Sequence, residues 1–135
     1  MAGFVPNEGE ALALNVVIKR ALGDRDADLE LGLFTNVAAD ETLVLASITE
    51  PVGTGYGRIT LTDATWTGAA DTRSYVQQTF TGGAGGWTGS IKGYFIATKA
   101  AGGTKRLLWL EIDGAGPYTI AENDTYKITL NITAA

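Results

Sequence analysis

Carboxylates are the side chains of this sequence best suited to chemistry, because histidine and cysteine are both absent. Their absence removes Ser–His and Cys–His dyads, the usual zinc ligands and disulfide bonds. Two carboxylates at a suitable separation could still hydrolyse a glycosidic bond. Seven acidic residues fall at expected turns or strand ends: Glu50, Asp63, Asp71, Glu111, Asp113, Glu122 and Asp124. A small carbohydrate-active enzyme is therefore kept as an alternative, but no catalytic residue is assigned.

Two short stretches have the look of ligand-binding loops. Residues 23–28 (GDRDAD) carry three alternating aspartates, yet the glycine and the bidentate glutamate of a calcium loop are missing at the required spacing. Residues 53–58 (GTGYGR) are rich in glycine but lack the Lys-Ser/Thr ending of a phosphate-binding loop. We expect both stretches to be turns, and we expect no metal and no cofactor.

The three tryptophans and five tyrosines suggest a second kind of chemistry, since aromatic faces stack on sugar rings. Packing in the core is the competing role, and we expect it for Trp109. If Trp66 and Trp87 are buried, the hypothesis of a glycan-binding surface loses its main support.

Composition limits the class of protein. A length of 135 residues fits one domain, and 18 glycines with many threonines near turns indicate a mainly β chain. The net charge of −5 would repel a phosphate backbone, so nucleic acid is not an expected partner. Residues 1–6 carry no basic residue, so the beginning of the sequence does not have the pattern of a secretory signal. The apolar run 11–18 is too short to span a bilayer. We expect synthesis in a cytoplasm and no membrane contact.

The N-terminal region divides into an arm and a helix. Residues 1–6 (MAGFVP) are apolar, and Phe4 and Val5 could fray, pack against the following helix or dock on a neighbouring subunit. Asn7 is a favoured N-cap with a glutamate three residues later, which predicts a helix over 7–22.

Alternating apolar residues predict strands in the remainder of the chain, at 28–35, 58–62, 74–80 and 126–132. We expect the last of these to lie in the middle of a sheet. The run 43–48 is apolar but too short to assign to a helix or a strand.

The stretch 87–112 contains two long apolar runs joined by a glycine-rich turn at 99–104. We expect these runs to form a pair of strands around which the rest of the chain packs. Neither run has a cleanly polar face, so both faces of this strand pair should be covered. A second sheet, the chain's own helix or a neighbouring subunit could supply the cover.

Several sequence segments, taken in their order along the chain, resemble a family of small virion structural proteins of tailed bacteriophages. The resemblance extends over nearly the whole chain and rests on FVPNEGE at 4–10, LGLFTN at 31–36, SITEPVGTGYGRITLT at 47–62, WTG at 66–68, YVQQTF at 75–80, IKGYFIAT at 91–98, LLWLEI at 107–112 and PYTI at 117–120.

The resemblance implies a single β-sandwich or jelly-roll-like domain over 23–135, without enzymatic activity. It implies a capsid decoration (cement) protein on the virion surface that binds the major capsid protein, with a homotrimer favoured. A tail or fibre component that binds host glycan is the alternative. For the contact with the partner we predict the arm and the first part of the helix, namely Phe4, Val5, Asn7 and Leu12.

Overall fold

The computed structural model describes residues 3–17, 28–98 and 105–133. This part of the chain is mainly β, with antiparallel sheets and a single α-helix, which confirms the class predicted from composition. Its elements are α1 (Asn7–Val17), β1 (Leu29–Phe34), β2 (Val52–Gly53), β3 (Ile59–Leu61), β4 (Thr72–Thr81), β5 (Trp87–Thr88), β6 (Gly93–Thr98), β7 (Leu107–Ile112) and β8 (Thr125–Thr133). Among the described residues, no helix is long and apolar enough to cross a membrane.

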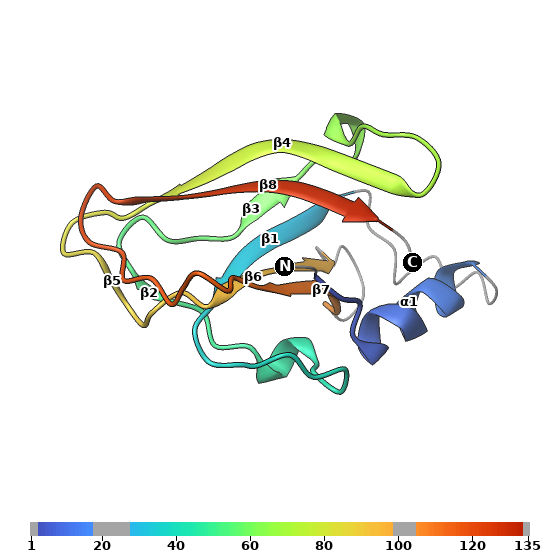
Figure 1. The fold of residues 1–135 in the computed structure, drawn as a ribbon, viewed down its shortest axis with the longest axis horizontal. Coiled ribbons are helices and arrows are strands. Elements are labelled where there is room, and N and C mark those ends of the chain that lie inside the picture. The colour runs from blue at the N-terminus through green and yellow to red at the C-terminus, as the bar shows by residue number, and fades with distance from the viewer. Residues whose placement is uncertain (1–2, 18–27, 99–104, 134–135) are drawn as a thin grey trace.

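Four strands form the central sheet, in the order β3-β1-β6-β7 (Figure 1). β6 and β7 are the antiparallel pair predicted within 87–112, with Phe95 opposite Leu110. The first run is shorter than predicted, because Trp87 and Thr88 leave this sheet and pair with β2. Gly89, with φ at +90°, turns the chain between the two parts, a conformation that glycine tolerates best. Residues 99–104 lie outside the described residues.

Both faces of the central sheet are buried, as its apolar pattern required. Leu31, Leu33 and Ile96 belong to the core cluster on one face. Phe95 and Leu107 belong to the cluster on the other. Strict alternation would place Leu107 beside Trp109, but the pairing of β6 with β7 shifts register after Ile96 and moves it to the opposite cluster.

The first face is covered by a two-stranded ribbon of β4 and β8 (Figure 1). Its inward side chains are buried against the sheet: Tyr75, Phe80, Tyr126, Ile128 and Leu130. The prediction that the last strand lies in the middle of a sheet was wrong, since among the described strands β8 pairs only with β4. Its alternating pattern reflects one covered face, which packing on another layer satisfies without a second strand neighbour.

The second face is covered by the N-terminal arm and by residues 36–48. Phe4 exchanges two backbone hydrogen bonds with Leu110 of β7, at 2.9 and 3.0 Å. Its side chain packs on the second core cluster, together with apolar residues of the 36–48 segment. Within the run 43–48 the chain forms only a short 3-10 turn, Leu45–Ser47. The cover therefore comes from within the same chain.

The helix begins at Asn7, as predicted, but its N-cap lies one residue earlier than predicted. The Pro6 carbonyl accepts hydrogen bonds from the N–H groups of Gly9 (2.8 Å) and Glu10 (3.1 Å). Because the carbonyl of the N-cap accepts the first helical bond, Pro6 and not Asn7 is the N-cap. The Asn7 N–H instead donates to the Glu41 carbonyl at 2.8 Å. Residues 18–22 of the predicted helix, and 23–27 of the aspartate turn, lie outside the described residues.

Candidate functional site

An apolar groove runs beside the N-terminal arm, and we call it the arm groove. It has a volume of about 520 Å³ and is lined by Gly3, Phe4, Val5, Glu10, Asp71, Arg73, Trp109, Ile132 and Thr133. Gly3 lies against the indole of Trp109 so closely that a Cβ atom would overlap the ring. The groove thus lies between the arm, β7 and the end of the β4–β8 ribbon.

Of the four predicted partner-binding residues, Phe4 and Val5 line this groove, and Asn7 and Leu12 are not among its lining residues. Phe4 is half-buried against the second core cluster of its own chain. For this residue, the alternative in which the arm packs within its own subunit is the one that the structure has. Val5 is 38% exposed, and Asn7 is exposed at the start of α1. Leu12 lies in α1, and its side chain is outside the described part. The contact of these residues with a partner stays a prediction.

Glu8 attaches helix α1 to two distant parts of the chain. Its Oε2 atom accepts hydrogen bonds from the backbone N–H groups of Leu45 (3.1 Å) and Leu107 (2.7 Å). From sequence, Glu8 is only a favourable acidic residue in the first turn of a helix. No local signal indicates that its carboxylate binds backbone groups 37 and 99 residues away.

A second polar feature is the charged cluster, which consists of Glu30, Glu50, Arg58 and Lys105. The Arg58 guanidinium binds Glu30 at 3.0 Å and Glu50 at 2.9 Å, and the Lys105 amine binds Glu30 at 2.9 Å. Two acidic and two basic groups balance one another. Arg58 also lies 5.2 Å from the centre of the Phe95 ring, in the range of a cation–π contact.

Tyr56 connects this cluster to the core. Its hydroxyl donates to Glu50 at 2.6 Å and accepts from the backbone N–H of Leu33 at 3.1 Å, beyond the point where β3 stops pairing with β1. Burial and the hydrogen bond to Glu50 raise the pKa of the Tyr56 hydroxyl. The glycine-rich stretch 53–58 is therefore a turn, as predicted, whose tyrosine and arginine tie it to the sheet.

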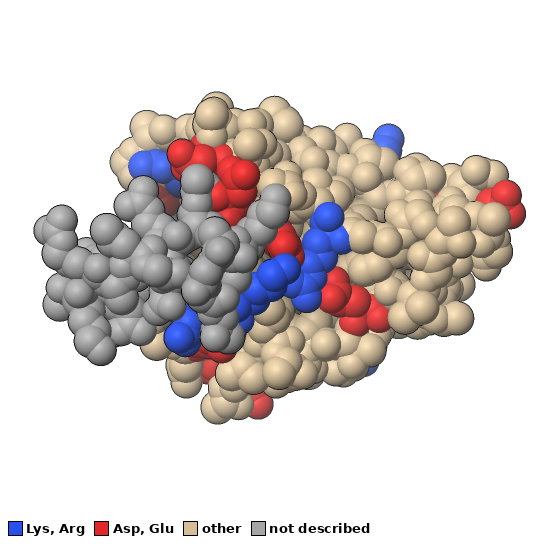
Figure 2. Space-filling model, turned by 180° about the vertical axis from the view of Figure 1, so that it is seen from behind, with Lys and Arg blue, Asp and Glu red and all other residues tan. Residues whose placement is uncertain are grey.

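The electrostatics of the cluster indicate a structural role. Burial alone would raise the pKa of Glu30, but hydrogen bonds from Lys105 and Arg58 outweigh it and hold that pKa below its ordinary value. A carboxylate held ionised by two cations is a weak base. Figure 2 shows a face on which acidic and basic side chains adjoin one another without forming a patch of one sign.

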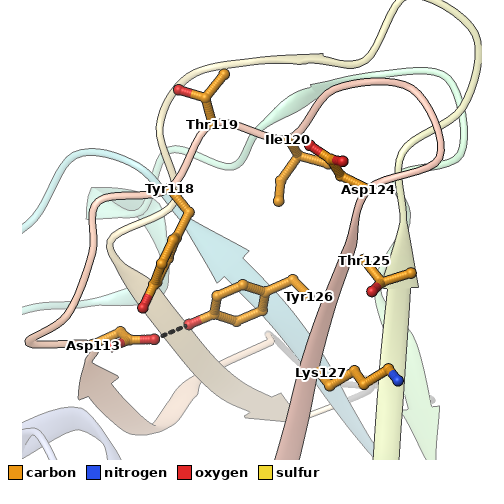
Figure 3. Close-up of a pocket in the computed structure, with 8 residues that line it drawn as sticks. All are labelled: Asp113, Tyr118, Thr119, Ile120, Asp124, Thr125, Tyr126 and Lys127. Carbon is orange, nitrogen blue, oxygen red and sulfur yellow. Dashed lines mark hydrogen bonds between the residues drawn. The ribbon is translucent and has the colours of Figure 1, made fainter.

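A third feature is an open cleft of about 550 Å³ beside the start of β8, which we call the tyrosine cleft (Figure 3). It is lined by Asp113, Tyr118, Thr119, Ile120, Asp124, Thr125, Tyr126 and Lys127. The Tyr126 hydroxyl donates to Asp113 at 2.7 Å, and burial together with this carboxylate raises the pKa of Tyr126. The Tyr118 and Tyr126 rings lie 5.7 Å apart, so that a half-buried Tyr118 forms one wall.

Two of the seven candidate carboxylates, Asp113 and Asp124, line this cleft without contacting each other (Figure 3). Asp113 accepts from Tyr126 and from the N–H of Ala115, and Asp124 accepts from the N–H of Ala121. Within the described ranges, no three acidic residues come together as a metal-binding group. The cleft thus offers hydrogen-bonding groups and an aromatic wall to a polar ligand.

The tryptophans contribute little to this cleft. Trp87 is 6% exposed and its indole N–H donates to the Thr54 carbonyl at 2.9 Å. Trp66 is half-buried, edge to face with Tyr75 at 5.0 Å. Trp109 is buried, which confirms its predicted place in the core. Trp87 is therefore not available to stack on a sugar ring. Among the residues that line the cleft, Tyr118 is the aromatic side chain on which the glycan hypothesis rests.

Comparison of the chain with models of protein families, with curated proteins and with solved structures found no match.

Proposed function

We propose that this protein is a non-enzymatic structural component of a bacteriophage virion, a β-sandwich or jelly-roll-like domain that decorates the capsid by binding the major capsid protein. Two independent considerations support the proposal. The first is the resemblance of several sequence segments, in their order along the chain, to small virion proteins. The second is the arm groove, an apolar surface feature of about 520 Å³.

The arm groove is the observation that carries the proposal. Val5 lines it and is 38% exposed, and the arm is held to β7 by the Phe4–Leu110 hydrogen bonds. A rigid apolar edge loses little conformational entropy when a partner covers it, which favours tight binding. The Glu8 contacts fix the helix that follows the arm, so the two are presented together.

In this function the protein acts by mass action. A protein that binds the assembled shell and not the free subunits stabilises the shell by a free energy that grows with the logarithm of its free concentration relative to its Kd. A homotrimer at local three-fold positions would place three arms on adjacent capsid subunits, in keeping with the symmetry of the shell.

The test uses particles of the phage that encodes the chain. Shells prepared without the protein are incubated with the wild type or with Val5→Asp, and bound protein is quantified against the major capsid protein. We expect near-stoichiometric binding of the wild type and at least about a tenfold loss for Val5→Asp, because an ionised group at the apolar contact is costly to desolvate.

Val76→Asp is the matched control, since Val76 is 62% exposed on β4 and is not among the residues that line the arm groove. Equal binding by all three proteins would reject the arm groove as the contact. Only a few copies of the protein on purified particles would place it in the tail or neck instead of on the shell, and its absence would reject both virion hypotheses.

A tail or fibre component that binds host glycan is the second candidate, and the tyrosine cleft favours it. Its aromatic wall and two carboxylates are groups that bind sugar rings and hydroxyls. The discriminating measurement is binding to a panel of cell-surface oligosaccharides by the wild type and by Tyr118→Ala. Loss of a measured signal in Tyr118→Ala would support this candidate, and a panel without any binding would reject it.

A further inference from the structure

We infer that the open edge of β8 pairs with the same edge of a second copy, in antiparallel orientation about a two-fold axis at Thr129. This inference concerns β8 alone and does not rest on the proposed function. A two-fold contact of this kind is also compatible with a separate three-fold contact in a shell that has both kinds of axis.

β8 presents a long unpaired edge. Among the described strands its nine residues pair with β4 only, and the isolated bridges of the described chain involve other residues. The Gly82 N–H donates to the Asp124 carbonyl at 2.9 Å. Since peptide groups alternate in direction along an antiparallel strand, the even-numbered residues of β8 face β4. The odd-numbered residues, from Thr125 to Thr133, therefore direct their N–H and C=O groups to the open edge.

Two other edges in the described fold, those of β7 and β4, are protected. Phe4 is paired with Leu110 on β7, and Thr67 is paired with Ser74 on β4. β4 also carries a bulge between Tyr75 and Gln78. Such features hinder pairing with another chain. The sequence of β8, TYKITLNIT, has neither proline nor glycine and one charge, a composition that favours the addition of a strand.

The sequence of β8 is complementary to itself. Thr129 is the midpoint of the strand, so antiparallel pairing centred there pairs all nine residues of each copy. Lys127 then lies opposite Asn131 of the second copy and not opposite the second lysine. A register centred on Lys127 would place two like charges face to face, which is unfavourable. Charge and length therefore select the same register.

The inner face of the strand agrees with this register. Tyr126 would lie opposite Ile132, and Ile128 opposite Leu130, which are favourable aromatic and aliphatic cross-strand pairs. The N-terminal half of β8 borders the tyrosine cleft, and Thr125 and Lys127 are among the residues that line it.

The first experiment uses the absence of cysteine from the chain. In the inferred pair, residue 129 of each copy faces its equivalent at a Cα separation of about 5.5 Å, within the range of a disulfide. Thr129→Cys should therefore form a disulfide-linked dimer under mild oxidation, visible by non-reducing electrophoresis. Thr79→Cys, on the exposed face of β4, is the matched control and should stay largely uncrosslinked.

The second experiment tests the register. A mixture of Lys127→Cys and Asn131→Cys should crosslink between the two variants, whereas each alone should crosslink far less. Light scattering on the wild type should detect the pair, and Thr129→Lys should weaken association by about tenfold or more, with Thr79→Lys unchanged. Equal crosslinking of Thr129→Cys and Thr79→Cys, or a wild type that stays monomeric at high concentration, would overturn the inference.

Discussion

The carboxylate of Glu8 accepts a hydrogen bond from the backbone N–H of Leu107 at 2.7 Å, across 99 residues of sequence. The same oxygen accepts from the N–H of Leu45. Three segments that are remote in the chain, namely the helix, the 36–48 segment and β7, therefore meet at one atom. The cover of the second sheet face depends on this contact as well as on apolar packing.

Glu8→Ala should destabilise the protein by about 2 kcal/mol, because it leaves two part-buried N–H groups without their acceptor. The free energy of unfolding in urea measures this loss. Glu10→Ala is the control, since Glu10 is exposed in the same helical turn and should contribute only about 0.5 kcal/mol through the helix dipole. Similar losses in the two variants would show that the hydrogen bonds of Glu8 add little.

Arg58→Ala should destabilise the fold by about 2 kcal/mol, because the Arg58 side chain is only 24% exposed and joins both glutamates of the charged cluster. Lys105→Ala should cost less than about 1 kcal/mol, since Lys105 is 44% exposed and binds Glu30 alone in that cluster. Urea unfolding of both variants gives the comparison. A larger loss for Lys105→Ala would contradict the central place of Arg58.

Acid should weaken the protein through Glu30. Its pKa is held below the ordinary value of 4.5, so the folded state favours the ionised form. The stabilisation is fully present above the unfolded pKa and is lost as the pH falls through the folded one. Glu30→Gln should be less stable than the wild type at neutral pH, and the difference should shrink at about pH 3. A constant difference across this range would contradict the prediction.

Alkali should weaken the protein through its tyrosines. The pKa values of Tyr56, Tyr94 and Tyr126 are raised above the ordinary 10.0 by burial and by a hydrogen bond to a carboxylate. Their contribution is present below the unfolded pKa and is lost as the pH rises above it. Near-ultraviolet titration should show these three tyrosinates forming together with unfolding. Their ionisation in a still-folded protein would argue against buried, hydrogen-bonded hydroxyls.

Gly93→Ala should be severely destabilising, by about 3 kcal/mol or more, because a Cβ atom there would overlap the backbone carbonyl of Glu111 and force β6 from β7. Gly57→Ala is the matched control, since no heavy atom lies within 4 Å of its Cβ position. We expect Gly57→Ala to change stability by less than about 1 kcal/mol. Thermal unfolding of the two variants separates a steric effect from a general cost of replacing glycine.

Alternation of apolar residues located the strands well because each has one face in contact with a core. The predicted 28–35 corresponds to β1, and the predicted 126–132 lies within β8. The same pattern does not report hydrogen-bonded neighbours, and β8 was therefore placed wrongly in the middle of a sheet. It also misses the register shift between Leu107 and Trp109, since a bulge breaks the alternation between the side chains on its two sides.

The polar features could not be predicted, because their partners are brought together only by the tertiary fold. Arg58 and Glu30 are separated by 28 residues, and Lys105 and Glu30 by 75. Nothing in the local sequence of these residues differs from that of an ordinary solvated charge. The arm was identified correctly as an apolar segment in need of a partner, but sequence left open whether its own chain or another supplies it.

The pairing of Phe4 with Leu110 also has a consequence for synthesis. On a ribosome the arm emerges before its partner strand β7, which appears only after about a hundred further residues. Until then the arm and the start of the helix have no complete sheet to cover, so a segment that is made before β7 is fixed only after β7 has been made. A contact between residues so far apart in sequence favours slow folding. It also leaves Phe4 and Val5 exposed to chaperones while the chain is being made.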